Sequence, residues 1–274
     1  MAIREPAVVV EAGIAESFAA EQVVPDAEVH VERDVTWVIH PGDFWRNAGV
    51  MVRFSAAAAE RRLDAIVDRY RANGRGMGMW VFPAATPASL PELLRARRFR
   101  CRKYYPAMLR HLAKRERSTP PSGIEIRRLQ NIAEFSGRFY PSIGPITTPL
   151  RATALNRLGA LLADPDRRTV AFVLYDRGQP VGAAELFVGA SHATLNGLHV
   201  LASHRGRGLG SALLEQACAE ASDRGAASIG LIATNDGERL YSRRGFDEAA
   251  RVGWWYRSFQ WKLPRARSVS RGRR

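Results

Sequence analysis

The residues His204-Arg205-Gly206-Arg207-Gly208-Leu209-Gly210-Ser211 lie between an apolar, strand-like run ending at Val200-Leu201 and a helical pattern that begins near Leu209. Such a strand-to-helix junction presents several backbone N–H groups at a helix N-terminus, where the helix dipole also favours negative charge. The glycines carry no Cβ that would keep a phosphate away from the main chain. Two arginines add positive charge beside it, so the stretch predicts a pyrophosphate-binding loop.

The spacing of the glycines separates this loop from other phosphate-binding motifs. A P-loop needs Lys followed by Ser or Thr after its last glycine, but here Ser211-Ala212 follows. A dinucleotide fingerprint needs G-x-G-x-x-G, whereas this run is G-x-G-x-G. The pattern Arg205-x-x-Gly208-x-Gly210, preceded by Leu198-His199-Val200-Leu201, resembles the acetyl-CoA-binding motif of the GNAT superfamily of N-acetyltransferases. The alternative is an Arg/Gly-rich surface turn.

A second motif follows at a suitable distance. The helix from Leu209 is expected to end at Gly225, and a short buried strand is expected over residues 226–233. The string Asn235-x-x-x-x-x-Tyr241-x-x-x-Gly-Phe then resembles the second part of the GNAT cofactor site. We expect Asn235 to cap its helix in a capping box with Glu238.

The first half of the chain contains a similar pattern. The segment from Val52 to Phe99 is nearly as long as that from Val200 to Phe246, and Asn47-Ala48-Gly49-Val50 resembles Asn196-Gly197-Leu198-His199. We infer a diverged duplication, so that the whole chain resembles a tandem GNAT protein. The alternative is that the halves are unrelated α/β units.

The first copy lacks the residues that carry the chemistry. It has no Arg-x-x-Gly-x-Gly pattern, and Leu94 aligns with Tyr241. Its predicted role is structural, or to shape the acceptor cleft between the domains.

The predicted fold class is α/β (α+β), with two GNAT-like domains that each have a mixed, mostly antiparallel sheet flanked by helices. We expect a degenerate domain over 1–112, a linker over 113–123, a catalytic domain over 124–263 and a basic disordered tail over 264–274. The elements expected from periodicity are helices at 56–70 and from a Ser89-x-x-Glu92 capping box to Phe99, a helical stretch through Phe135 and Phe139, and strands at 80–82, 124–127, 170–175, 181–188, 194–201 and 254–263.

Composition favours a soluble, cytoplasmic protein. No apolar run is long enough to span a bilayer, and the N-terminus has no secretory signal pattern. Cys101 and Cys218 make neither a disulfide framework nor a metal site, and we expect no metal. The net charge of +14 suggests nucleic acid, but the basic tail supplies five of these charges, and a basic surface also suits CoA. We therefore expect no nucleic-acid partner.

The resemblance implies that acetyl-CoA lies in a V between the strand ending at Val200 and the strand before Asn235. The main chain at Val200 would polarise the thioester carbonyl, and Tyr241 would protonate the departing thiolate. Glu185 and His199 are the candidate general bases, and an amine that arrives neutral needs neither. Because consecutive strand residues face opposite sides, we expect Thr194 and His199 to lie on opposite faces of the sheet. The cofactor-binding residues implied are Val200, Leu201, Arg205, Gly206, Arg207, Gly208, Leu209, Gly210, Ser211 and Asn235.

The predicted function is transfer of an acetyl group to a primary amine of a small molecule or peptide by direct attack. By the resemblance, the loop from Phe139 to Pro149 covers the acceptor, and the aromatic strand with Trp254, Trp255, Tyr256, Phe259 and Trp261 either forms another wall or belongs to the core. The alternative function is a non-catalytic, acyl-CoA-binding regulatory protein. The sequence does not determine the oligomeric state.

Overall fold

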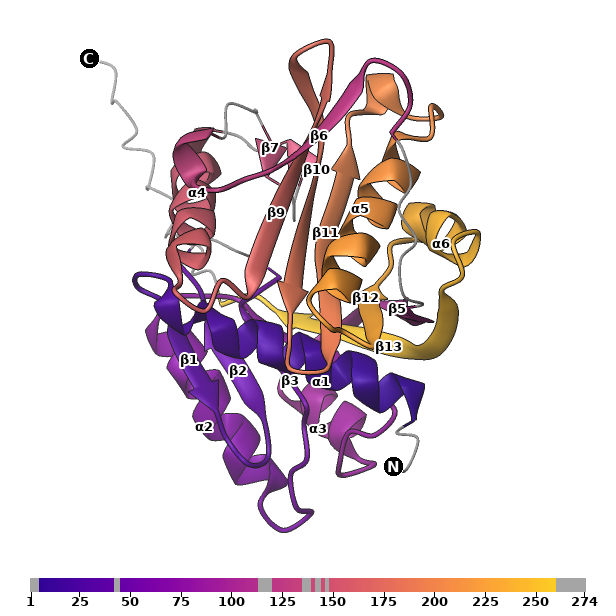
Figure 1. Ribbon diagram of the computed structural model, residues 1–274. Coiled ribbons are helices and arrows are strands. Elements are labelled where there is room, and N and C mark those ends of the chain that lie inside the picture. The colour runs from indigo at the N-terminus through magenta and orange to yellow at the C-terminus, as the bar shows by residue number, and fades with distance from the viewer. Residues whose placement is uncertain are drawn as a thin grey trace, which may run out of the picture.

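The computed structural model describes residues 5–41, 45–112, 120–134, 139–140, 144–145 and 148–259. Within them, one continuous sheet of eleven strands runs through the molecule, and helices cover both of its faces (Figure 1). The predicted α/β class with a mixed, mostly antiparallel sheet is confirmed. The predicted tail 264–274, most of the predicted linker and Trp261 lie outside the described residues.

The strands follow the order β1-β2-β3-β4-β13-β5-β12-β11-β10-β9-β6. Their bounds are β1 Glu28–Val31, β2 Thr36–Ile39, β3 Ala48–Val50, β4 Met77–Val81, β5 Arg100–His111, β6 Ile124–Arg128, β9 Thr169–Asp176, β10 Gln179–Val188, β11 His192–Val200, β12 Ser228–Ile232 and β13 Asp247–Arg257. A separate two-stranded hairpin joins β7 (Phe139–Tyr140) and β8 (Gly144–Pro145).

The two halves of the sheet are related by a pseudo-twofold arrangement, in which their last strands are exchanged. The two parallel pairs among the described strands, β3 with β4 and β11 with β12, occupy equivalent places on either side of the centre. In the first half β4 pairs with β13 from the end of the chain, and in the second half β12 pairs with β5 from the first half. Since β13 and β5 also pair with each other, each half completes its sheet with a strand from the other. This order is the one that a duplicated unit would give.

The helices are α1 (Pro6–Ala19), α2 (Ala59–Ala72), α3 (Leu90–Ala96), α4 (Thr148–Ala163), α5 (Leu209–Asp223) and α6 (Asn235–Ser242), with short 3₁₀ turns η1 (Ala20–Val23), η2 (Ile132–Glu134) and η3 (Ala202–His204). One face of the sheet packs against α1 and α4, and the other against α2, α3 and α5. Figure 1 shows α1 lying across the middle of the sheet, where it contacts strands of both halves.

Several sequence-based expectations need correction. Neither α1 nor α4 was expected, since neither has a strongly amphipathic pattern. Phe139 lies in strand β7 rather than in a helix. The last strand is Asp247–Arg257, so it begins seven residues before the expected start at 254, and residues 260–263 of the expected strand lie outside the described residues. Ser89 precedes α3 as expected, but its side chain makes no capping hydrogen bond.

The predicted boundary near residue 112 falls at the end of β5, and a strand of the second half begins at Ile124. These boundaries stay a prediction, because the sheet itself is not divided there. Residues 247–257 belong by sequence to the second half, but they pair on both edges with strands of the first half, β4 and β5.

Gly78→Ala tests the packing beside the exchanged strand. A Cβ at Gly78 in β4 would come within 1.9 Å of the Trp254 ring on β13, so the ring would have to move within a packed core. We expect a loss of about 1–3 kcal/mol in the free energy of unfolding, measured by urea denaturation. Gly210→Ala is the matched control, since its Cβ would make only ordinary contacts in α5. Equal stability of the two variants would contradict this account of the β4–β13 contact.

Candidate functional site

The second half of the sheet splits open at β11. This strand pairs with β12 only over His192–Thr194 and Ser228–Gly230, and β12 then continues to Ile232 along β5 alone. The separation begins where β11 carries a bulge relative to β10. A bulge bends its strand and increases the local twist, so it directs β11 away from β12. The result is the predicted V-shaped gap between β11 and β12.

The main chain of Val200 faces this gap. Leu201 N–H donates a hydrogen bond to Val181 O on β10 at 2.9 Å. Successive residues of a strand direct their N–H groups to alternate sides, so Val200 N–H points away from β10 and toward the gap. Of the two predicted main-chain contacts, Val200 is therefore placed to meet a ligand there, whereas the Leu201 amide is used within the sheet.

The glycine-rich loop forms an open turn at the N-terminus of α5. Gly206 and Gly208 have φ of 77° and 79°, and both are exposed with no atom near the place of a Cβ. Gly208 is the N-cap residue, and no side chain caps this helix. The first-turn N–H groups therefore have no partner within the helix and suit an anion such as pyrophosphate.

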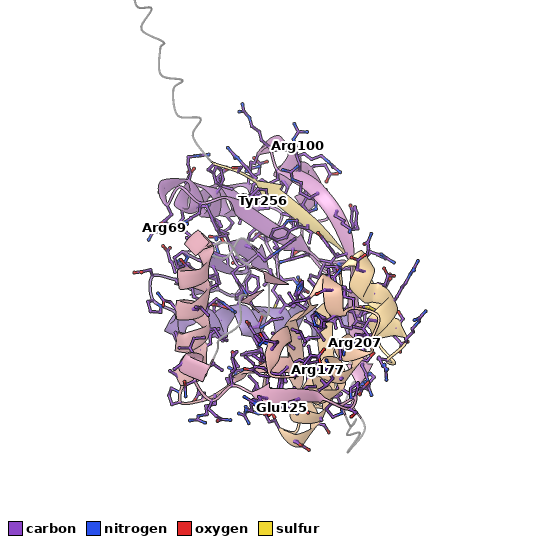
Figure 2. The ribbon with its side chains drawn as sticks, turned by 90° about the horizontal axis from the view of Figure 1, so that it is seen from above. Arg69, Arg100, Glu125, Arg177, Arg207 and Tyr256 are labelled. Atoms are coloured by element: carbon purple, nitrogen blue, oxygen red, sulfur yellow. The ribbon has the colours of Figure 1, made fainter. Side chains whose placement is uncertain are left out.

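The arginines of the loop are held by hydrogen bonds. Arg205 Nε donates to Val200 O at 3.1 Å, and Arg207 donates to the Asp176 carboxylate at 2.6 Å. The hydrogen bond from Arg207 holds the pKa of Asp176 below its usual range, with further help from Arg177. Figure 2 shows Arg177 and Arg207 near each other on the same side of the molecule. Positive charge thus gathers beside the loop.

Tyr241 lies in α6 across the gap from β11. Its ring packs 5.6 Å from Phe246 between ring centroids, and a Cβ at Gly237 would come within 2.8 Å of it. Burial raises the pKa of the Tyr241 phenol well above its usual value, so the hydroxyl stays protonated at neutral pH. No described side chain hydrogen-bonds this hydroxyl, which leaves its proton available to a ligand.

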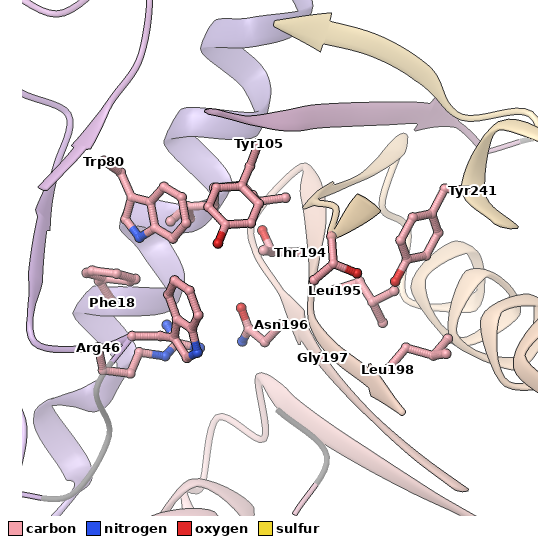
Figure 3. Close-up of a pocket in the computed structure, with 14 residues that line it drawn as sticks. Phe18, Arg46, Trp80, Tyr105, Thr194, Leu195, Asn196, Gly197, Leu198 and Tyr241 are labelled. Atoms are coloured by element: carbon pink, nitrogen blue, oxygen red, sulfur yellow. The ribbon is translucent and has the colours of Figure 1, made fainter. Parts of the chain in front are cut away.

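The gap leads into a cavity of about 240 Å³ that both halves of the chain enclose (Figure 3). The second half contributes polar groups on Thr194, Asn196, Thr234 and Tyr241. The first half contributes Phe18, Trp45, Arg46, Trp80 and Tyr105. The first half therefore shapes the cavity at the V, although sequence analysis singled out none of these five residues for such a role.

Trp254 lies behind this cavity rather than on its surface. Its ring packs 4.4 Å from Trp80 and 5.1 Å from Trp45, and it is only 2% exposed. Trp255 is equally buried, on the opposite face of the sheet. Of the two interpretations of the aromatic strand, the structure supports a core role for these two tryptophans.

Glu185 belongs to a buried ion-pair network. Both oxygens of its carboxylate accept hydrogen bonds from Arg157 at 2.9 Å, and Arg46 lies 3.7 Å away. Arg157 also binds Glu21, and Asn196 Nδ2 donates to Glu185 at 3.3 Å. Glu185 is fully buried and does not line the cavity, but Arg46 and Asn196 connect it to the cavity wall.

His199 lies on the same face of the sheet as Thr194, which corrects the expectation from simple alternation. The register between β10 and β11 shifts between Glu185 and Leu186, and the extra residue on β11 is Asn196. One extra residue reverses the alternation beyond it. His199 is half-buried, and burial together with the nearby Arg205 charge lowers its pKa below the ordinary 6.5. It does not line the cavity.

Asn235 is the first residue of α6 and is exposed. The N-cap is Thr234 instead, whose hydroxyl accepts a hydrogen bond from Gly237 N–H at 3.2 Å. Glu238 pairs with Arg251 rather than completing a capping box. The predicted capping role of Asn235 is therefore wrong, because the helix begins one residue earlier than expected.

The equivalent gap in the first half is closed by the chain itself. Beyond β3, Val52 O accepts a hydrogen bond from Thr86 N–H at 3.0 Å, and Phe54 O accepts one from the Thr86 hydroxyl at 3.1 Å. The segment at Thr86 thus occupies the main-chain position that stays open at Val200. The absence of a glycine loop in this half agrees with the closed geometry.

Comparison with known proteins relates one segment of the chain to a known family. Residues 129–246 match the model of the acetyltransferase (GNAT) family, so the chain contains a domain of this family. The glycine loop, the V-shaped gap and Tyr241 all lie within the matched segment.

Solved structures share the fold over nearly the whole chain. A GCN5-related N-acetyltransferase from Kribbella flavida aligns with a TM-score of 0.61 and 18% identity over 88% of this chain and 94% of that chain. A GCN5-related N-acetyltransferase from Sphaerobacter thermophilus aligns with a TM-score of 0.56 and 19% identity over 94% of this chain and 94% of that chain. A tandem GNAT protein from the clavulanic acid biosynthesis pathway aligns with a TM-score of 0.54 and 13% identity over 96% of this chain and 98% of that chain.

A search of curated proteins gave no significant match. Among the described residues, the helices are too short or too polar for a membrane span. The predicted cytoplasmic location stays a prediction.

His199 predicts a pH dependence of stability. Because its folded-state pKa lies below 6.5, the unfolded chain binds the proton more readily, and stability falls as the pH drops through that value. Urea denaturation at about pH 7.5 and about pH 5.5 measures the free energy of unfolding. On acidification this free energy should fall less for His199→Gln than for the native chain. Between about pH 7.5 and 8.5 this replacement should not change the dependence of the free energy of unfolding on pH. An equal acid-side loss in both proteins would contradict the assignment.

Proposed function

We propose that the protein is an acetyl-CoA-dependent N-acetyltransferase that acetylates a primary amine of a small molecule or peptide. The observation that carries the proposal is the gap between β11 and β12, with the Val200 N–H on one side and the protonated Tyr241 on the other. An open helix N-terminus follows β11, and a cavity lined by both halves of the chain adjoins the gap. This arrangement suits a donor with a phosphate group and a separate acceptor.

The residues present fit acetyl-CoA as the donor. Main-chain N–H groups from Arg205 to Ser211 would hold the pyrophosphate, because the turn is exposed and the helix is uncapped. Arg207 adds a cation at the surface. The exposed Asn235 would contact the pantetheine arm from the other side of the gap. When bound, acetyl-CoA supplies an acyl group on a good leaving group.

The chain's own groups would then act on the reacting atoms. Val200 N–H would donate to the carbonyl oxygen and stabilise the negative charge that develops there. Tyr241 would give its hydroxyl proton to the departing sulfur as the amine nitrogen bonds to the carbonyl carbon and the carbon–sulfur bond breaks. Solvent restores that proton, and the nitrogen loses one. The expected products are an N-acetyl amine and CoA.

The proton of the amine has two possible acceptors on the chain. His199 would be neutral at physiological pH because of its lowered pKa, so it is in the form that accepts a proton. Glu185 is already held by Arg157 and Asn196, which makes it a weaker acceptor. Since neither side chain lines the cavity, transfer to either would require water, and an amine that arrives neutral would need neither.

Gly210→Glu tests the donor site. The added carboxylate would lie in the first turn of α5 and repel a pyrophosphate there, so the Kd for acetyl-CoA should rise at least about tenfold, or about 1.4 kcal/mol, in a calorimetric titration. Gln216→Glu, which adds the same charge to the middle of α5, is the control and should bind as the native chain does. Equal binding by both variants, or no binding by the folded native chain, would remove the donor site from the loop.

Tyr241→Phe tests the acid. The replacement keeps the ring beside Phe246 and removes only the hydroxyl, so kcat should fall on the order of 10²-fold while the Kd for acetyl-CoA stays nearly unchanged. Release of free CoA from an established acceptor measures turnover. An unchanged kcat would assign the proton to another group. Binding of acetyl-CoA without transfer to any amine would instead support a non-catalytic regulatory protein.

A further inference from the structure

The wall that the first half contributes to the cavity is aromatic, and donor binding does not account for it. Trp80, Trp45 and Tyr105 come from β4, the segment before β3, and β5, yet their rings meet at one place. Trp45 lies 6.0 Å from Trp80 and 6.2 Å from Tyr105 between ring centroids, and the rings of Trp45 and Tyr105 are perpendicular. We call these three residues the aromatic wall.

Two members of the aromatic wall, Trp45 and Tyr105, keep part of their side chains exposed beside the cavity, whereas Trp80 is only 7% exposed. Trp45 remains 37% exposed although three other aromatic rings surround it. The Tyr105 side chain is half-buried, and Figure 3 shows its hydroxyl pointing toward the middle of the cavity. Large aromatic side chains that stay exposed beside a cavity are typical of a site that buries an apolar ligand.

The size of the cavity limits what fits against this wall. An apolar cavity of about 150 Å³ holds a benzene molecule. The volume of about 240 Å³ therefore has room for one aromatic ring and a chain of a few more atoms. Such a molecule would place its ring on the aromatic wall and extend its chain toward Asn196 and the gap between β11 and β12, where the amine must lie.

The charge of the cavity disfavours a polycation. The one charged side chain among the described residues that line it is Arg46, which is positive. Arg46 is paired with Glu21 at 3.4 Å and with Glu185 at 3.7 Å behind the cavity wall, and it lies over the Phe18 ring at 5.1 Å. A second ammonium group on the acceptor would lose its water beside this guanidinium without gaining a carboxylate from the described lining.

We propose that the acceptor is a small aromatic monoamine, an aryl ring joined by a short chain to one primary amine. This inference rests on the proposed N-acetyltransferase function and names its substrate class. The ring binds the aromatic wall from the first half of the chain, and the amine reaches the gap in the second half. The first copy thus sets acceptor specificity, although it has no open donor site of its own.

The test is acetyl transfer from acetyl-CoA to three amines, followed by release of free CoA. Phenethylamine represents the proposed class, butylamine has the same kind of amine without a ring, and spermidine is a polycation. Aromatic contacts give a ring preference on the order of tenfold, so kcat/KM for phenethylamine should exceed that for butylamine at least about tenfold. Spermidine should be the poorest acceptor.

Variants of the aromatic wall test whether its rings cause the preference for phenethylamine over butylamine. Tyr105→Leu should lower kcat/KM for phenethylamine about tenfold, and it should lower kcat/KM for butylamine less, so that the ratio between the two amines falls. Trp45→Leu is a second variant at an exposed position, in case Tyr105→Leu fails to fold. Tyr104→Leu is the matched control, because Tyr104 is the next residue of β5, is 57% exposed and does not line the cavity.

The outcomes separate the two proposals. Preference for phenethylamine that is lost in Tyr105→Leu and kept in Tyr104→Leu supports the inference. Equal or better turnover of butylamine or spermidine overturns it and leaves the N-acetyltransferase function intact. If no amine reacts, phenethylamine is titrated calorimetrically into the CoA-saturated protein. Binding that requires Tyr105 would retain the aromatic acceptor site and reject the acetyl transfer. No binding would overturn both the acceptor site and the transfer.

Discussion

The pairing of β13 with both β4 and β5 is the constraint on which the rest of the structure depends. A strand has two edges, and in this sheet both edges of the last strand are used by the first half. The strand that would otherwise complete the first half, β5, instead pairs with β12 of the second. The halves therefore share one hydrogen-bonded sheet and cannot move as separate bodies without breaking backbone hydrogen bonds. Each half needs the other for a complete sheet.

The shared sheet determines which parts of the chain form the candidate active site. It places Trp80 and Tyr105 opposite β11, where the second half opens its gap. The ion pairs that join Glu21 and Arg46 to Arg157 and Glu185 fix the same junction from inside the core. Removing one partner of such a buried network would leave an uncompensated charge and cost about 3–5 kcal/mol. Of the two halves, one thus has an open gap that suits the proposed donor, and the other has a closed gap and supplies a wall of the cavity.

The elements that form the candidate donor site were predictable from sequence because they are local. The glycine turn, the strand before it and the helix after it are contiguous, and Tyr241 follows at a fixed spacing. The cavity was not predictable, since Trp80 on β4 and Tyr105 on β5 reach the gap beside β11 only through the exchange of β5 and β13. The face of His199 was predicted wrongly because one bulge residue, Asn196, reverses the alternation, and no residue type marks that bulge. The helices α1 and α4 were missed because they are covered on more than one side and carry no clear polar face.

The central claim is that the second half alone binds the donor and that the first half faces the reacting end of it. A crystal structure of the protein with acetyl-CoA tests this most directly. The account predicts the pyrophosphate at the N-terminus of α5, the thioester carbonyl oxygen within hydrogen-bond distance of Val200 N, and the acetyl group directed toward the cavity that Trp45, Trp80 and Tyr105 line. A donor bound at the closed gap beside Val52, or entering the second half from the side of the aromatic wall, would contradict it.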